Sequence, residues 1–233
     1  MFFFDPRYML FMAPAMILMV AVQWYVSSAY QKWSRVPARS RMSGAQAAEH
    51  LIRRSGLSDV RVEGVSGKMT DHYDPRSKVL RLSSGVYQGS SVAALAIAAH
   101  ELGHAMQDKE GYAPLKFRAA IVPAVNIGSY LGWILIIIGL LLNFTTLAWL
   151  GIVVFSAGAL FALATLPVEL NASKRARQLL VESGLIVGSD EMSGVNNVLN
   201  AAAMTYVAAL ITAVLQMLYY VTLVLGMGGR RRG

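Results

Sequence analysis

The chain has 233 residues, of which 55% are hydrophobic and only 15% charged, and its formal net charge is +8. Soluble domains carry roughly 25% charged residues, so this composition excludes an ordinary soluble protein. The basic excess does not indicate nucleic-acid binding, because 14 of the 21 Lys and Arg lie within residues 32–118, among carboxylates and without interleaved stacking aromatics.

Three long uncharged stretches indicate a multi-pass membrane protein. Residues 8–31, 119–168 and 192–229 contain no Asp, Glu, Lys or Arg. The middle stretch is long enough for two crossings of roughly 20 residues each. We therefore predict about four transmembrane helices, and their expected ranges are 9–26, 121–142, 147–166 and 202–225, with a tight turn at 143–146 and a polar helix at 168–183.

Residues 34–113 form the one sizeable soluble region of the sequence. Ser43 begins a capping-box pattern, which predicts a short amphipathic helix that ends near Gly56. Two strand-like runs follow at 60–65 and 79–82, separated by turn-forming residues. A small-residue helix is then expected over 92–109.

The basic residues that flank the crossings predict the orientation. Ten Lys and Arg lie near the crossings on the side of the soluble region, against Arg7 and the tail Arg230–Arg232 on the opposite side. Cytoplasmic flanks collect Lys and Arg, so the soluble region is expected to face the cytoplasm. The tail disagrees with this rule, because an even number of crossings places it outside with the N-terminus.

The motif that carries chemistry is His100-Glu101-Leu102-Gly103-His104. On a helix, residues four apart share a face, so both imidazoles can present a nitrogen to one metal ion. Glu101 lies about 100° round the helix from His100, close to such an ion but not bound to it, where it can act as a general base. The alternative is that both histidines are polar core residues of a helix near the membrane.

A catalytic zinc usually has three protein ligands and leaves the fourth position to water, whose pKa it lowers towards about 7. The chain has no cysteine, so zinc must be held by His and carboxylate. Glu169 is the leading candidate for the third ligand, because the helical hairpin between the motif and Glu169 leaves and re-enters the membrane on one side. An ordinary first-turn Glu is the alternative, and the weaker candidates are His50, His72 and Glu182.

Two further groups of residues invite a functional interpretation. The run Val79, Leu80, Arg81 and Leu82 could be an exposed edge strand that binds an extended peptide, or an ordinary hairpin strand. Asn196, Asn197 and Asn200 are expected to satisfy helix ends or neighbouring helices rather than to bind substrate.

These motifs resemble those of the bacterial YugP-type neutral zinc metallopeptidases. The resemblance covers nearly the whole chain from about Tyr30 onward, and its specific parts are the run from Ala99 to Ala105 and the segment Glu169-Leu170-Asn171-Ala172-Ser173. That family in turn resembles the HtpX and CAAX prenyl protease group, membrane gluzincins whose active site faces the cytoplasm.

The resemblance implies specific roles for the site residues. His100, His104 and Glu169 would be the ligands of one Zn²⁺ per chain, and Glu101 would be the catalytic base. The larger group often has an Asp four residues after the ligand Glu, where it orients the first His. Ser173 stands at that position here and would orient His100 more weakly. No residue is assigned to oxyanion stabilisation.

The predicted fold is a mainly α-helical multi-pass membrane protein with a small α+β zincin-like cytoplasmic region. Its segments are an N-terminal transmembrane anchor (1–30), the cytoplasmic α+β region with the active-site helix (31–118), a transmembrane hairpin (119–167), a cytoplasmic helical segment with the third ligand (168–201), and a C-terminal transmembrane helix with a basic tail (202–233).

The predicted function is that of a zinc metalloendopeptidase in a bacterial plasma membrane, acting through zinc-activated water. The expected partners are membrane lipid and peptide or membrane-protein substrates that are membrane-associated or exposed to the cytoplasm. The alternative is a zinc-binding membrane scaffold or quality-control factor without proteolytic activity. The sequence does not predict an oligomeric state.

Overall fold

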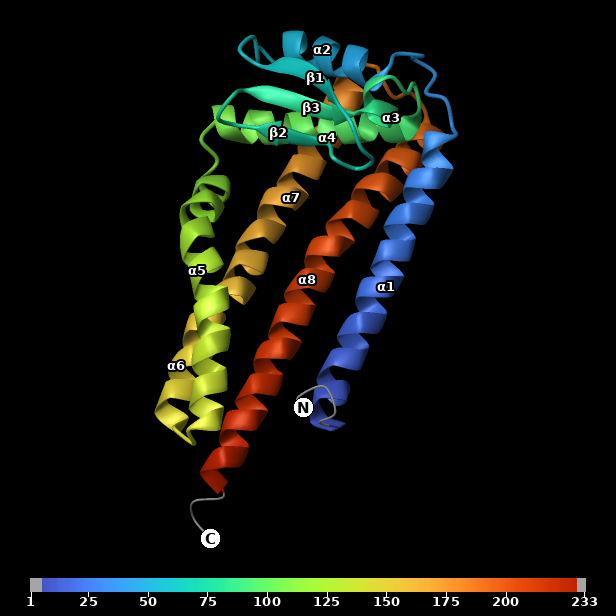
Figure 1. Cartoon of the computed structure of the whole chain (residues 1–233). Coiled ribbons are helices and arrows are strands. Elements are labelled where there is room, and N and C mark those ends of the chain that lie inside the picture. The colour runs from blue at the N-terminus through green and yellow to red at the C-terminus, as the bar shows by residue number, and fades with distance from the viewer. Residues whose placement is uncertain (1–5, 230–233) are drawn as a thin grey trace. The chain divides into compact units, whose positions relative to one another are not determined.

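The computed structural model describes residues 6–229. The predicted position of the basic tail, Arg230–Arg232, therefore lies outside the described residues. Helices and strands follow in the order α1 (Pro6–Ser34), α2 (Gly44–Arg54), β1 (Arg61–Val65), β2 (His72–Asp74), β3 (Val79–Ser83), α3 (Ser84–Tyr87), α4 (Val92–Lys109), α5 (Ala113–Leu141), α6 (Thr145–Phe155), α7 (Ala157–Glu182) and α8 (Ser189–Gly229), as Figure 1 shows.

The chain folds into two compact units. Unit 1 comprises Met1–Val22, Lys116–Leu166 and Thr205–Gly233, and unit 2 comprises Gln23–Leu115 and Pro167–Met204. Each unit is thus assembled from segments that are far apart in the sequence. Unit 2 contains the sheet and the motif helix, and unit 1 contains the most apolar parts of α1, α5, α7 and α8 together with all of α6.

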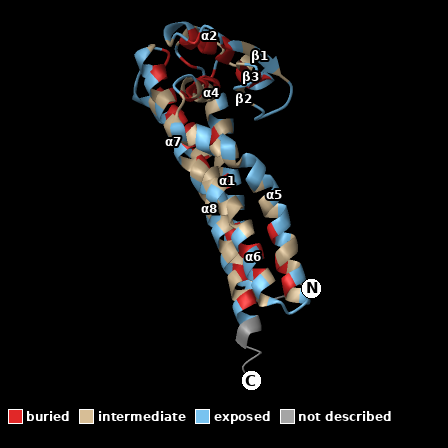
Figure 2. Cartoon of the chain, turned by 90° about the vertical axis from the view of Figure 1, so that its left-hand side faces the viewer, coloured by how far each residue is buried: buried red, intermediate tan, exposed pale blue. Residues whose placement is uncertain are grey.

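Unit 1 is membrane-spanning. Within residues 6–229, four helical segments are long and apolar enough to cross a membrane. Only 17–22% of their most apolar windows is buried inside the protein, which leaves apolar side chains facing outward, as the pale and tan helices in Figure 2 show. α5 and α6 approach closely, because a Cβ at Gly132 or Gly139 would fall 2.5 Å from a backbone nitrogen of α6.

The helices are longer than the sequence predicts. The second part of the expected third crossing and the expected polar helix after it form one helix, α7, which continues through Pro167. The break instead lies at Ser156, between α6 and α7. An interior proline removes one backbone hydrogen bond, but membrane helices tolerate it because neighbouring helices and local adjustments satisfy the freed backbone groups. α8 likewise begins at Ser189, well before the predicted crossing.

The sheet of unit 2 has three strands in the order β1-β3-β2. β3 runs parallel to β1 and antiparallel to β2, with Val62 opposite Leu80 and Tyr73 opposite Leu80 on the other side. The prediction that residues 79–82 form an exposed edge strand is therefore wrong. β3 is the central strand, and its backbone groups face a partner strand on both sides, whereas the alternative of an ordinary hairpin strand is correct for β2 and β3.

The core of unit 2 lies between the sheet and the helices α2 and α4. These helices pack directly against each other, and Figure 2 shows the strands beside the pair. The predicted capping box at Ser43 is present, and Ser91 caps α4 by accepting from the Ala94 N–H at 3.2 Å. Gly56 and Gly184 follow α2 and α7 with positive φ of 64° and 70°, as expected of residues that end a helix.

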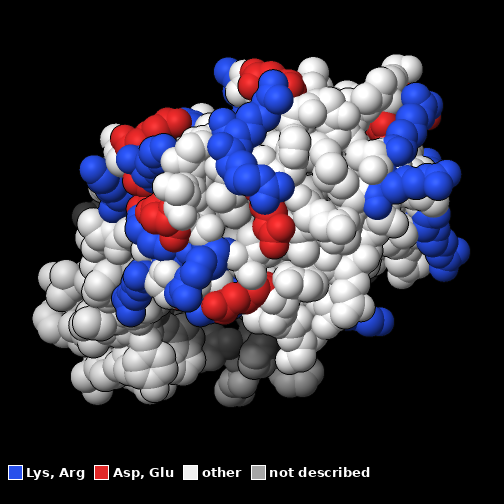
Figure 3. Space-filling view, turned by 90° about the horizontal axis from the view of Figure 1, so that it is seen from above, with Lys and Arg blue, Asp and Glu red and all other residues white. Residues whose placement is uncertain are grey.

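Charge is mixed over the surface seen in Figure 3. Lys and Arg lie beside Asp and Glu there rather than in one basic patch. Ion pairs of unit 2 include Arg39 with Asp190 at 2.7 Å and Arg175 with Glu110 at 2.6 Å. The positive net charge therefore does not form a single basic patch on this face.

Candidate metal centre

α4 places the two motif histidines on one face. The rings of His100 and His104 lie edge to face, with their centroids 4.9 Å apart and their planes at 84°. Their side chains are only 13% and 14% exposed. Small buried residues, Ala98, Ala99 and Ala105, surround them on the helix and let neighbouring elements approach closely.

α7 brings Glu169 to the same point. One carboxylate oxygen, Oε2, lies 3.3 Å from Nε2 of His100 and 3.5 Å from Nε2 of His104, and the side chain is 4% exposed. The three possible ligand atoms all lie within 4.8 Å of one another. All three residues belong to unit 2, although the whole transmembrane hairpin separates them in the sequence.

This donor set fits zinc. Two imidazole nitrogens and one carboxylate oxygen are the ligands of many catalytic zinc sites. Tetrahedral coordination with bonds of about 2.0–2.1 Å places neighbouring ligand atoms roughly 3.3 Å apart, and the distances from Glu169 to the two imidazoles are 3.3 and 3.5 Å. The other candidates lie elsewhere: His72 and Glu182 are exposed, His50 is partly exposed on α2, and none belongs to the cluster.

The electrostatics of the cluster favour a positive charge. Burial alone would lower the pKa of His104, but the hydrogen bond to Glu169 and the negative charge of Glu101 outweigh burial, and the net effect raises its pKa. The same negative potential that stabilises a proton on His104 also attracts a metal cation, because the proton and the cation are both positively charged.

The outward ring nitrogens also have partners. Nδ1 of His100 lies 3.2 Å from the Ser173 hydroxyl, which is the contact that the resemblance implied. Nδ1 of His104 lies 3.0 Å from Oε1 of Gln107. Gln107 was not among the predicted site residues, although its position three residues after His104 puts it on the same helical face and could have revealed it.

Glu101 is held by β2, one of the two edge strands of the sheet. Its Oε2 accepts a hydrogen bond from the main-chain N–H of Tyr73 in β2 at 3.1 Å. The Tyr73 hydroxyl donates to Asp108 at 2.8 Å, two turns further along α4, so β2 is tied to the helix at two points. Burial, together with this hydrogen bond to Asp108, raises the pKa of Tyr73 and keeps the phenol neutral.

The remaining predicted residues have structural partners. Val79, Leu80 and Leu82 are buried in β3, and Arg81 pairs with Asp74 at 3.0 Å. The expected contacts of the asparagines with neighbouring helices are present. Asn196 and Asn200 accept hydrogen bonds from Arg177, and Asn197 accepts one from the Trp33 indole.

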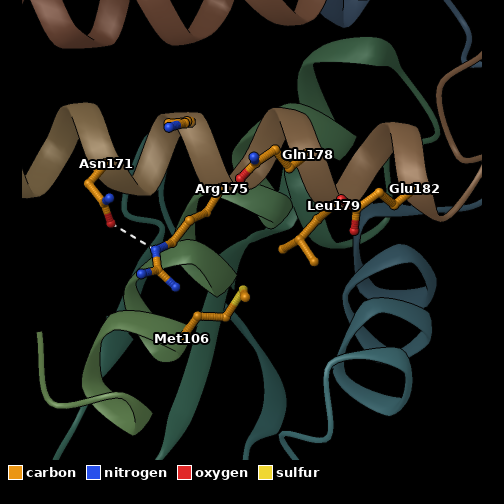
Figure 4. Close-up of a pocket in the computed structure, with 7 residues that line it drawn as sticks. Met106, Asn171, Arg175, Gln178, Leu179 and Glu182 are labelled. Carbon is orange, nitrogen blue, oxygen red and sulfur yellow. Dashed lines mark hydrogen bonds between the residues drawn. The ribbon is translucent and has the colours of Figure 1, made fainter.

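A groove lies beside the centre, between α4 and α7. It has a volume of about 330 Å³, and its lining residues are Met106, Asn171, Lys174, Arg175, Gln178, Leu179 and Glu182, most of which Figure 4 labels. His100, His104 and Glu169 do not line this groove. The groove is connected to the centre through Asn171, which accepts a hydrogen bond from Gln107, the partner of His104.

Comparison with known proteins gives a consistent result. The profile of a family described as "Putative neutral zinc metallopeptidase" matches residues 8–225. The chain is 46% identical over 203 residues to "Putative membrane protease YugP" of Bacillus subtilis (strain 168), which covers 87% of this chain and 90% of that protein. No solved structure matches the chain.

Proposed function

The chain belongs to the neutral zinc metallopeptidase family, and we propose that it is a membrane-bound zinc metalloendopeptidase. The observation that carries this proposal is the convergence of Nε2 of His100 and Nε2 of His104 on one oxygen of Glu169, at 3.3 and 3.5 Å. These three residues would hold one Zn²⁺ per chain.

Zinc, when bound, supplies a Lewis acid that polarises the peptide carbonyl and makes water more acidic. Glu101 then acts as the general base. Its carboxylate accepts a proton from water as the water oxygen bonds to the carbonyl carbon, and it returns that proton to the amide nitrogen as the C–N bond breaks. The hydrogen bond from the Tyr73 N–H to Oε2 of Glu101, at 3.1 Å, orients this carboxylate.

The substrates would be polypeptides that are membrane-associated or exposed to the cytoplasm. The basic flanks of the crossings support a cytoplasmic position for unit 2 in a bacterial plasma membrane. The relative in Bacillus subtilis supports a bacterial setting. Membrane lipid would surround the apolar helices, and peptide segments would reach the centre from the cytoplasmic side.

Glu101→Gln tests the proposal, with Glu63→Gln, an exposed glutamate of β1, as the matched control. The purified full chain is assayed in detergent for zinc content and for hydrolysis of a peptide library. We expect Glu101→Gln to keep its zinc while cleavage falls by roughly 10²–10⁴-fold, the usual contribution of a general base. The control should behave as the wild type.

Three results would contradict the proposal. Wild-type cleavage by Glu101→Gln would show that Glu101 is not the general base. Loss of zinc with Glu101 would make this residue a ligand instead. A wild-type protein that holds zinc but hydrolyses no peptide would leave the alternative function, a zinc-binding scaffold without proteolytic activity.

A further inference from the structure

The orientation of the Gln107 side chain is fixed by its hydrogen bonds. Its Nε2 donates to the Val168 carbonyl oxygen at 2.8 Å and to Oδ1 of Asn171 at 2.9 Å. Both partners are acceptors, so a flipped carboxamide would place oxygen against two oxygens. The residue is fully buried, at 0% exposure, so water does not compete for these bonds. The oxygen end, Oε1, must therefore face His104.

This orientation selects one tautomer of His104. A carboxamide oxygen only accepts hydrogen bonds, so Nδ1 of His104, at 3.0 Å from Oε1, carries a proton. A neutral imidazole has a proton on one nitrogen only. The lone pair is then left on Nε2, which is the nitrogen that faces Glu169.

Asn171 is held in turn by a charged network. Its Oδ1 also accepts a hydrogen bond from Nε of Arg175 at 2.8 Å, the contact drawn as a dashed line in Figure 4. The two terminal nitrogens of Arg175 bind the two oxygens of Glu110 at 2.6 Å each. Because Asn171 accepts from two donors, its amide is also oriented, and α4 and α7 are joined on both sides of Gln107.

We propose that Gln107, oriented by Asn171, is a positioning residue that holds His104 in the tautomer that binds metal. The inference rests on the proposed function, because it concerns the same zinc centre. It adds that the metal affinity of this chain depends on a buried uncharged amide in contact with His104, and on a network that reaches the surface at Glu110. Outer partners of ligand histidines typically contribute 10–100-fold to metal affinity.

The test measures zinc affinity of the purified full chain by competition with a chromophoric chelator. We expect Gln107→Met to weaken zinc binding by about 10–100-fold. Asn171→Leu should weaken it less, and Asn171→Asp, which keeps an oxygen acceptor for both donors, should stay close to the wild type. Gln178→Met makes the same chemical change at an exposed position of α7 and serves as the matched control.

A second readout separates positioning from mere packing. The chain has four histidines, so labelling histidine with ¹⁵N gives a simple spectrum of the zinc-loaded protein. A protected Nδ1–H signal of His104 should be present in the wild type and lost in Gln107→Met. The thermal midpoint of the metal-free protein should change much less than zinc affinity does.

The proposal is wrong if Gln107→Met binds zinc as tightly as the wild type, or if affinity falls only in step with unfolding of the metal-free chain while the Nδ1–H signal persists. A wild type that binds no zinc would defeat both this inference and the proposed function. A wild type that binds zinc without cleaving peptides would defeat the proposed function alone, because affinity carries this test.

Discussion

Gly103 lies directly against the backbone of Ala172, so close that a Cβ at Gly103 would fall 2.6 Å from the Ala172 carbonyl oxygen. This contact is where α4 crosses α7. Because the two helices touch here, the side chains of the two α4 histidines can reach the Glu169 carboxylate of α7. The absence of a side chain at Gly103 therefore sets the distance between α4 and α7 at the candidate metal centre.

Gly103→Ala should disturb both stability and metal binding. The obstacle is backbone rather than a flexible side chain, so α4 and α7 must separate, at a cost of about 1–3 kcal/mol. Zinc affinity should fall because Glu169 moves away from the imidazoles. Gly64→Ala in β1 is the control, since its Cβ would meet the Tyr87 ring at an ordinary 3.4 Å. Chelator competition and thermal unfolding measure the two effects, and unchanged zinc affinity would refute the spacing argument.

Glu169→Ala should lose zinc outright. The substitution removes one of three ligands and leaves two imidazoles facing an apolar methyl group. We expect a loss of affinity beyond the roughly 10–100-fold that outer partners contribute. Metal analysis of the purified protein measures it, with Glu182→Ala, an exposed glutamate of the same helix, as the control. Zinc retained at wild-type stoichiometry would move the third ligand to another residue.

Ser173→Ala should weaken zinc binding only modestly. The hydroxyl contacts Nδ1 of His100 at 3.2 Å and is neutral, so it orients the ring less strongly than a carboxylate would. We expect about a tenfold loss or less, at the low end for such partners. Ser183→Ala, just after the end of α7, is the matched control because the Ser183 hydroxyl donates to the Leu180 carbonyl of the preceding helix. A loss as large as that of Glu169→Ala would contradict this ranking.

Asp74→Asn should show a pH-dependent cost. Hydrogen bonds from Ser77 and then Arg81 lower the pKa of Asp74 in the folded chain. A lowered carboxyl pKa stabilises the fold above the unfolded value, about 3.9 for Asp, and this stabilisation is lost as pH falls through the folded value. The variant should therefore be less stable than the wild type at neutral pH, and the difference should shrink below about pH 4. Asp59→Asn, at an exposed position, is the control for thermal unfolding across this range.

Cysteine labelling checks the orientation. The chain has no cysteine of its own, so a single Cys at the exposed Lys68 can be labelled selectively. A membrane-impermeant maleimide should leave Lys68→Cys unmodified in intact cells and modify it after lysis. Leu142→Cys, exposed near the turn between α5 and α6, should react in intact cells. The reverse pattern would place unit 2 outside.

Local signals predicted much of the fold. The capping box at Ser43 and the cap at Ser91 depend on neighbours three residues away, and both are present. The position of Glu169 followed from the hairpin, because two crossings return the chain to the side on which it left. These features can be predicted from neighbouring residues and from the thickness of a membrane, without knowing which distant segments are in contact.

Features set by distant contacts were harder to predict. β2 has three residues, too few for an alternating pattern, and its presence makes β3 the central strand. The parallel pairing of β1 with β3 skips β2 in sequence, so no turn signal reveals it. The spacing of Gln107 from His104 was a local signal for this residue, but the contacts that orient its amide, with Val168 and Asn171, lie on a helix reached only after two crossings.

The order of the candidate metal ligands along the chain has a consequence for biosynthesis. His100 and His104 are translated before α5 and α6, and Glu169 only after them. A nascent chain that has not yet inserted this hairpin holds two imidazoles without their carboxylate partner. Assembly of the candidate centre therefore requires this hairpin, and the proposed peptidase activity would arise only after α5 and α6 have been translated.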